Sequence, residues 1–157
     1  IACDAAGLIE GVTFPTARPR VMHAERTFWE KATAIHVFCL QERLRGDRFA
    51  RHWHDVARLD EAGFAASASA DRYLANAVAR HKTMFFAEKA SDRTSIDYAA
   101  AVNGGLRLVP AGDGLKTLDE DYARMVDDGL LLDDAEPFEA LMARCADIAT
   151  RANNAAA

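Results

Sequence analysis

Apolar residues return at helical spacing through most of the chain from about residue 24 onward. Between Glu25 and about Arg43 they recur every three or four positions, at Phe28, Ala32, Ile35 and Cys39. This is the period of one face of an α-helix. Because Trp29 and Leu40 widen the apolar stripe, the pattern predicts a helix at the centre of the fold.

The same spacing predicts four more helices. Their approximate ranges are Arg48 to Ala62, Ser69 to Phe86, Leu115 to Asp128 and Ala135 to Ala152. Gly63 lies where the first of these should end, and Pro137 falls in the first turn of the last, where proline is tolerated. The intervening residues 87–113 predict only a helical turn, a glycine turn and a short buried segment from Leu106 to Val109.

Residues 7–23 have a different pattern. Gly11, Pro15 and Pro19 interrupt any helix, and the short runs between them are β-like. We therefore expect a mainly α protein, a bundle of about five to six helices with a short extended or β lead-in. The expected divisions are a lead-in over 1–23, a helical domain over 24–152 and a tail over 153–157.

Composition fits one soluble globular domain. The chain has 157 residues, of which 50% are hydrophobic and 27% charged. Its three cysteines are odd in number and widely spaced, which favours neither a disulfide framework nor a metal site and indicates a reducing, cytoplasmic setting. We find no signal peptide and no apolar run near the roughly 20 residues of a membrane helix, so no membrane association is expected.

The net charge of −5 conceals two opposite stretches. Nine basic and five acidic residues lie between Arg18 and Arg58, whereas three basic and eleven acidic residues lie between Gly112 and Asp147. The first stretch fits a phosphate ligand and the second a basic partner. Both also fit ordinary solvated helix faces, and the acidic run Asp119 to Asp121 is most simply solvated.

One candidate for chemistry is Lys31, which lies beside the apolar stripe of the central helix. A lysine at the edge of a core often packs its stem and extends its amine to water. The alternative is a lysine that offers its charge to a phosphate. A second basic pair, His81 and Lys82 beside Phe85 and Phe86, fits either a nucleic-acid surface or a helix end capped by basic residues.

The second candidate segment runs from Arg51 to Leu59. Arg51 and Asp55 lie four residues apart and share a helix face, so they suit a simple ion pair. His52 and His54 point about 200° apart on a helix and cannot chelate one ion. No metal site is predicted from this chain.

Taken together, the two segments resemble the AbiEii/AbiGii toxin family of nucleotidyltransferase-like proteins from bacterial type IV toxin–antitoxin and abortive-infection systems. The first segment with this likeness is Glu25-Arg26-Thr27-Phe28-Trp29-Glu30-Lys31-Ala32-Thr33, and the second is Arg51-His52-Trp53-His54-Asp55-Val56-Ala57-Arg58-Leu59. Weaker likeness comes from residues 81–86, from residues 106–110, and from Asp121-Tyr122 with Met125. The resemblance covers about residues 1 to 145.

The resemblance implies specific roles. In the family, an N-terminal Gly-Ser motif and an acidic pair on a strand hold Mg²⁺ and a nucleoside triphosphate, and the helical part completes the pocket. By motif match, Lys31 would bind the triphosphate, Asp55 would be the catalytic polar residue at the reacting centre, and Arg51 would orient it beside the nucleotide. The implied partners are a nucleoside triphosphate, a cognate antitoxin and an acceptor, for which RNA is a candidate.

The sequence departs from the family pattern at three points. His52 stands where many members have Asp, and His54 where Tyr is frequent. No Gly-Ser motif and no Asp-x-Asp strand occurs in the chain, which begins at Ile1. We therefore expect a C-terminal portion that is inactive alone, and an exposed apolar face around Phe28 and Trp29 through which it self-associates.

Two other readings stay open at this stage. The chain fits a non-catalytic helical interaction module that docks an antitoxin or a partner domain. It also fits a domain in which the paired motifs survive only as core packing.

Overall fold

The computed structural model describes residues 18–42, 47–131 and 135–156, and these form a bundle of α-helices. The helices are α2 (Ala24–Gln41), α3 (Arg51–Glu61), α4 (Phe64–Ala70), α5 (Arg72–Phe85), α6 (Tyr98–Ala100), α7 (Gly112–Asp127) and α8 (Phe138–Asn154), with a π-helical turn, η1 (Ala101–Gly105), after α6. In these residues the β pairing is a single bridge between Lys89 and Ser95. The prediction of a mainly α bundle is confirmed.

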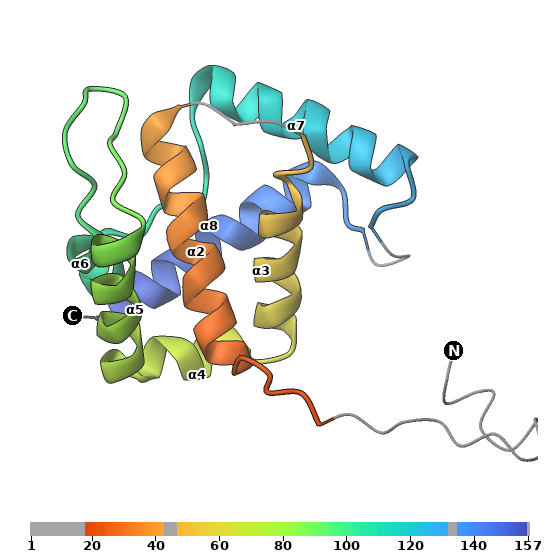
Figure 1. Ribbon diagram of the computed structural model, residues 1–157. Helices are drawn as coiled ribbons and strands as arrows, with labels where there is room; N and C mark the ends of the chain where they lie inside the picture. The colour runs from red at the N-terminus through yellow and green to blue at the C-terminus, as the bar shows by residue number, and fades with distance from the viewer. Residues whose placement is uncertain (1–17, 43–46, 132–134, 157) are drawn as a thin grey trace, which may run out of the picture.

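The central position predicted for the first helix is also confirmed. In Figure 1, α2 runs through the front of the bundle between α5 and α3, while α8 crosses behind it and α4 closes the base. Trp29 is fully buried, and its indole N–H donates to the carbonyl of Ala68 at 2.9 Å. A buried indole N–H needs such a partner, so this bond fixes α2 against α4.

The helix predicted from about Ser69 to Phe86 corresponds to α5, while the separate helix α4 before it was not predicted. Gly63, at φ 83°, ends the preceding segment as expected, but α4 then begins at Phe64. Asp71 interrupts the helical backbone at φ −83°, ψ 83°, and its carboxylate accepts from the backbone N–H of Leu74. Aspartate is a preferred N-cap, so this residue starts a second helix, α5.

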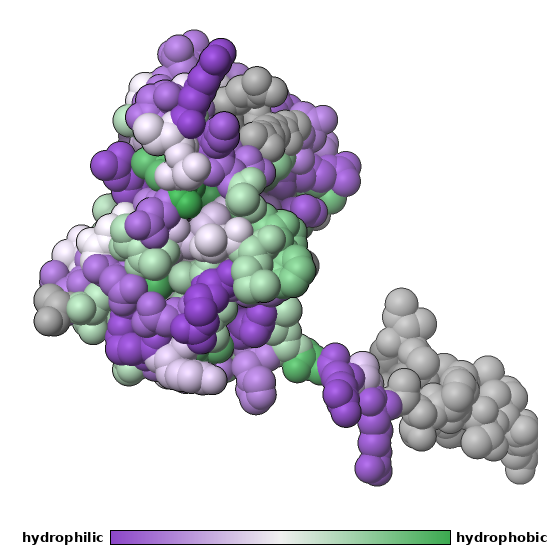
Figure 2. Space-filling view, turned by 60° about the vertical axis from the view of Figure 1, so that its left-hand side comes forward, coloured by the Kyte–Doolittle hydropathy of each residue, from purple (hydrophilic) through white to green (hydrophobic). Residues whose placement is uncertain are grey.

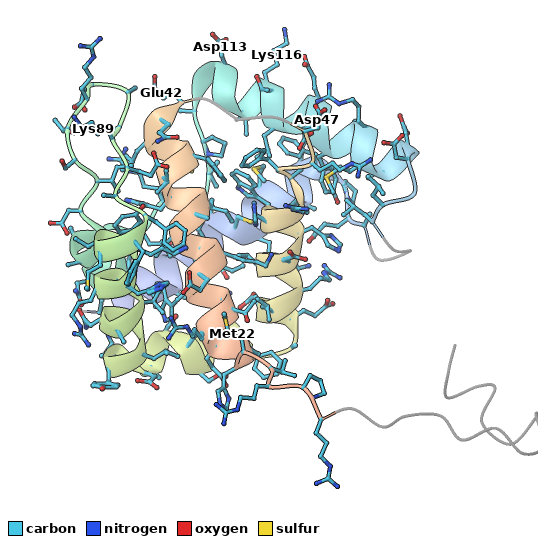
Figure 3. The ribbon with its side chains drawn as sticks, in the orientation of Figure 1. Met22, Glu42, Asp47, Lys89, Asp113 and Lys116 are labelled. Atoms are coloured by element: carbon cyan, nitrogen blue, oxygen red, sulfur yellow. The ribbon has the colours of Figure 1, made fainter. Side chains whose placement is uncertain are left out.

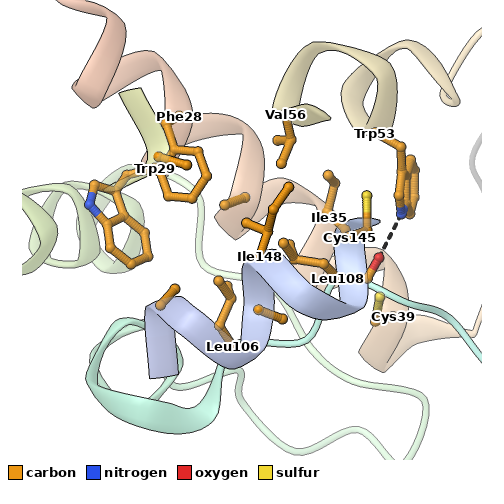
Figure 4. Packing of buried hydrophobic residues seen from close by; sticks show 14 of the residues in the cluster. Phe28, Trp29, Ile35, Cys39, Trp53, Val56, Leu106, Leu108, Cys145 and Ile148 are labelled. Atoms are coloured by element: carbon orange, nitrogen blue, oxygen red, sulfur yellow. Dashed lines mark hydrogen bonds between the residues drawn. The ribbon is translucent and has the colours of Figure 1, made fainter. Parts of the chain in front are cut away.

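The core lies between α2, α3 and α8. Figure 4 shows Phe28, Ile35, Val56, Cys145 and Ile148 interleaved there. The dashed line in the figure is the bond from the Trp53 indole N–H to the carbonyl of Leu108, at 2.7 Å. It ties α3 to the segment after η1, where the predicted burial of Leu106 is confirmed.

The expected apolar face around Phe28 and Trp29 is not exposed. Both side chains are fully buried, and α4 packs against α2 at Trp29. The prediction of an exposed apolar face at Phe28 and Trp29, on which self-association was expected, is therefore wrong. The large apolar side chains that are exposed include Met84, Phe85 and Phe86 at the end of α5, and apolar side chains gather in the middle of the face in Figure 2.

The sequence predicts an extended lead-in at one end of the chain and a short tail at the other. Residues 18–23 contain neither helix nor strand, and the rest of the predicted lead-in lies outside the described residues. Helix α8 continues through Asn154, into the segment expected to be a tail. The Asn153 side chain accepts from the Leu106 N–H and donates to the Leu106 carbonyl, so its amide has a structural role. None of the described helices is long and apolar enough to span a membrane.

Candidate functional site

Lys31 and Asp55, the two residues singled out from separate segments, meet in the structure. The Lys31 Nζ lies 2.6 Å from Asp55 Oδ2, and the two side chains are 26% and 39% exposed. Lys31 lies at the edge of the buried stripe of α2, and Asp55 occupies the corresponding edge of α3. The packing of α2 against α3 therefore brings the two charged groups to the surface together.

Asp55 pairs with Lys31 and not with Arg51, although the spacing of Arg51 and Asp55 suits a helix pair. Since a half-exposed ion pair of this kind stabilises a protein by at most about 1 kcal/mol, stability alone is a weak reason for the arrangement. The pair places one cation and one carboxylate where a ligand can reach both.

Two pockets share Asp55 as a wall. The first, of about 300 Å³, is lined by Thr27, Lys31, Asp55, Arg58, Leu59, Ala62 and Phe64. The second, of about 360 Å³, is lined by Arg48, Arg51, His54, Asp55, Met125, Leu130 and Leu131. Each volume lies within the range of small-molecule sites. Lys31 thus belongs to one pocket and Arg51 to the other, with Asp55 between them.

The turn before α3 is held by Asp121, a residue that the sequence pattern predicts to be exposed to solvent. Asp121 on α7 is only 2% exposed, and its two carboxylate oxygens accept from the backbone N–H groups of Arg48 and Ala50, each at 2.9 Å. Arg48 and Ala50 directly precede α3, so Asp121 fixes the turn that leads into this helix and to Arg51.

His52 lies beside several cationic side chains. Burial, together with the charges of Lys31, Arg51 and Lys82, lowers its pKa to about 4. Its Nδ1 is buried without a hydrogen-bond partner. The imidazole is therefore neutral at neutral pH and adds no negative charge to this face.

A second charged cluster lies on the other side of α2. Glu30 Oε2 is 2.7 Å from the Lys82 Nζ, and Glu30 Oε1 is 3.4 Å from Arg26 and 3.6 Å from His81 Nδ1. The Lys82 Nζ also lies 4.8 Å from the centroid of the Phe86 ring. The sequence marked His81 and Lys82 as a basic pair but gave no sign that Glu30 would be their partner.

The implied Mg²⁺ ion has no fitting site in the part of the chain that the structure describes. Magnesium takes oxygen ligands, mainly carboxylates and water. Across residues 18–42, 47–131 and 135–156, no three His, Cys, Asp or Glu side chains gather closely enough to hold an ion.

The chain matches a known protein family. Residues 2–144 match the model of the family described as nucleotidyl transferase AbiEii toxin, type IV toxin–antitoxin system. No curated protein and no solved structure gives a significant match. The family match covers most of the chain, including Lys31, Asp55 and the helices that position them. The chain therefore belongs to the AbiEii family of nucleotidyltransferase-like toxins of type IV toxin–antitoxin systems.

Proposed function

We propose that this chain forms the helical side of a nucleotidyltransferase pocket, in which a nucleotide passes from a nucleoside triphosphate to an acceptor. In such a transfer an acceptor oxygen bonds to the α-phosphorus, and the bond from that phosphorus to the leaving pyrophosphate breaks. RNA is the candidate acceptor. The observation that carries the proposal is the pairing of Lys31 with Asp55 at the boundary of two pockets.

Lys31 is the group we assign to the triphosphate. Its amine has three N–H donors and a fixed positive charge, which suit phosphate oxygens. The amine lies against Asp55 and opens on the 300 Å³ pocket. A bound triphosphate would take over the contact that Asp55 now makes, and the lysine would then offset charge that develops on the phosphoryl oxygens.

Asp55 and Arg51 are assigned to the reacting centre. Released from Lys31, the Asp55 carboxylate faces both pockets, so it can accept the proton of an acceptor hydroxyl or orient that hydroxyl. Arg51 lines the second pocket with Arg48 and would hold phosphate groups near Asp55. The sequence contains no Gly-Ser motif, and residues 18–42, 47–131 and 135–156 include no strand with an acidic pair, so we expect the chain to bind nucleotide but not to catalyse transfer by itself.

The second candidate is a non-catalytic helical module that docks an antitoxin or a partner domain. The exposed Met84, Phe85 and Phe86 are the observation that favours it, because contiguous exposed apolar side chains mark interaction surfaces. The two proposals differ in whether the Lys31 pocket holds a ligand. Either function is compatible with the cytoplasmic location that the cysteines suggest.

We expect the chain to bind a nucleoside triphosphate in the presence of Mg²⁺, and Lys31→Ala to weaken that binding at least about tenfold. A hydrogen bond to a charged group contributes roughly 1.5–3 kcal/mol, which corresponds to about tenfold or more in affinity. Calorimetric titration of the four common nucleoside triphosphates measures this. Lys116→Ala is the matched control, because Lys116 projects from α7 away from the bundle in Figure 3.

The outcomes separate the two candidates. Equal weakening by Lys31→Ala and Lys116→Ala would indicate nonspecific charge attraction and would remove Lys31 from the site. No binding of any of the four nucleotides would favour the interaction module.

A further inference from the structure

The pair formed by Glu30 and Lys82 repeats the arrangement of Asp55 and Lys31 on the opposite edge of α2. In each pair a lysine amine contacts one carboxylate oxygen, at 2.7 Å for Lys82 and 2.6 Å for Lys31. The two partners on α2, Glu30 and Lys31, are consecutive residues. Their side chains therefore leave the helix about 100° apart, one toward α5 and the other toward α3.

The strip of α2 between these two edges is narrow and carries no acidic residue. Helical geometry places Thr27, Ala34, Phe38 and Gln41 on it. All four are partly exposed. Phe38 packs against Phe49 and against His52 and Trp53 near the start of α3, and Gln41 donates to Glu88, so the open part of the strip is at Thr27 and Ala34. A ligand lying across it would have Lys31 on one side and Lys82 on the other.

The charge around the strip is positive in excess. The cations near it are Arg26, Lys31, Arg51 and Lys82. The carboxylates near it are Glu30, Asp55 and Glu88, the last of which accepts from Gln41, so four positive charges face three negative charges. Burial is the main cause of the low pKa of His52, and the charges of Lys31, Arg51 and Lys82 lower that pKa further. Such a surface favours a polyanion.

We infer that Lys82 is a second phosphate-binding lysine and that Glu30 is its resting counter-ion, displaced when a polyphosphate lies across α2. The inference rests on the proposed function, since it assigns a second contact to the same ligand. Lys31 and Lys82 would then bind different phosphate groups of one triphosphate.

The surroundings of Lys82 suit an exchange of partners. The Lys82 and Glu30 side chains are 13% and 18% exposed, so the amine is mostly removed from water and interacts strongly with any anion that reaches it. The Phe86 ring, 4.8 Å away, holds the amine in place by a cation–π contact when the carboxylate moves. Glu30 keeps Arg26 and His81 as neighbours, so it is not left as an isolated charge.

The test is calorimetric binding of inorganic tripolyphosphate to the wild-type chain and to Lys31→Ala, Lys82→Ala, Glu30→Gln and Lys116→Ala variants. We expect Lys82→Ala to weaken binding about tenfold, as a charge-assisted contact is lost, and to make the affinity less sensitive to salt. Glu30→Gln should tighten binding severalfold, because it removes the competing charge. A purely structural pair would give the opposite result for Glu30→Gln, with lower thermal stability and no gain in affinity.

Thermal unfolding of each variant keeps the result interpretable. If Lys82→Ala unfolds the chain, the Glu30→Gln result decides alone. Weakening by Lys31→Ala with wild-type affinity in both Lys82→Ala and Glu30→Gln overturns this inference and leaves the proposed function standing. No effect of Lys31→Ala overturns both.

Discussion

Replacing Asp121 with alanine should lower the free energy of unfolding by about 3 kcal/mol. The substitution leaves the backbone N–H groups of Arg48 and Ala50 without their acceptor, and Ala50 is fully buried. Each lost hydrogen bond to a charged group costs roughly 1.5–3 kcal/mol, and part of this loss is recovered as the turn relaxes toward water. Urea denaturation followed by circular dichroism measures the change.

The matched control is Asp119→Ala on the same helix, because Asp119 is exposed. That substitution should change stability by no more than about 0.5 kcal/mol. Equal effects of the two substitutions would show that the negative charge of α7 matters and that the two bonds to the turn before α3 do not. Since this turn leads to Arg51, the Asp121 variant should also weaken nucleotide binding while it is still folded.

Acidification from pH 7 to 5 should destabilise the fold by about 2 kcal/mol through His36 alone. Burial, with a smaller contribution from Arg107, lowers the pKa of His36 from 6.5 to about 4. The unfolded chain therefore takes up a proton as the pH falls below about 6.5, whereas the folded chain does not until about pH 4. Stability is lost across that window at about 1.4 kcal/mol per pH unit.

A specific hydrogen bond also favours the neutral His36 ring in the folded chain. His36 Nδ1 accepts from the backbone N–H of Arg107 at 3.1 Å, and a protonated ring would present a second donor there. His36→Asn keeps an acceptor without a titrating group, so urea titrations at pH 7 and pH 5 should differ less for this variant. The exposed His23 gives the control His23→Asn, which should retain the wild-type difference. An unchanged pH dependence in His36→Asn would contradict this assignment, and His52 would then be the next candidate because its pKa is lowered in the same direction.

The parts of the fold that the sequence predicted are those set by local periodicity. The stripes that contain Phe28, Leu118 and Ile148 marked the buried faces of α2, α7 and α8, and the structure confirms their burial. Gly63 was a usable stop signal because its left-handed backbone favours glycine. By contrast, the split between α4 and α5 depends on how one side chain, that of Asp71, bonds to the backbone, and composition does not report this.

The candidate site also has residues that the local sequence pattern predicted and partners that depend on non-local packing. Lys31 and Asp55 were selected because charged residues beside apolar stripes stand out, and the structure brings them into contact. Asp121 was assigned to the solvent because it lies in an acidic run, and its burial depends on a loop 71 residues away in sequence. The pairing of Glu30 with Lys82 is equally non-local, since it depends on how α5 packs on α2. Single-sequence patterns identify reactive residues more readily than their partners.

A crystal structure of this chain with a non-hydrolysable nucleoside triphosphate would test the central claim most directly. The claim is that Lys31 and Asp55 line one nucleotide site. We predict phosphate oxygens within about 3 Å of the Lys31 Nζ, with the Asp55 carboxylate turned away from the amine toward the α-phosphate. A nucleotide bound elsewhere, with the 2.6 Å contact between Lys31 and Asp55 unchanged, would contradict the claim.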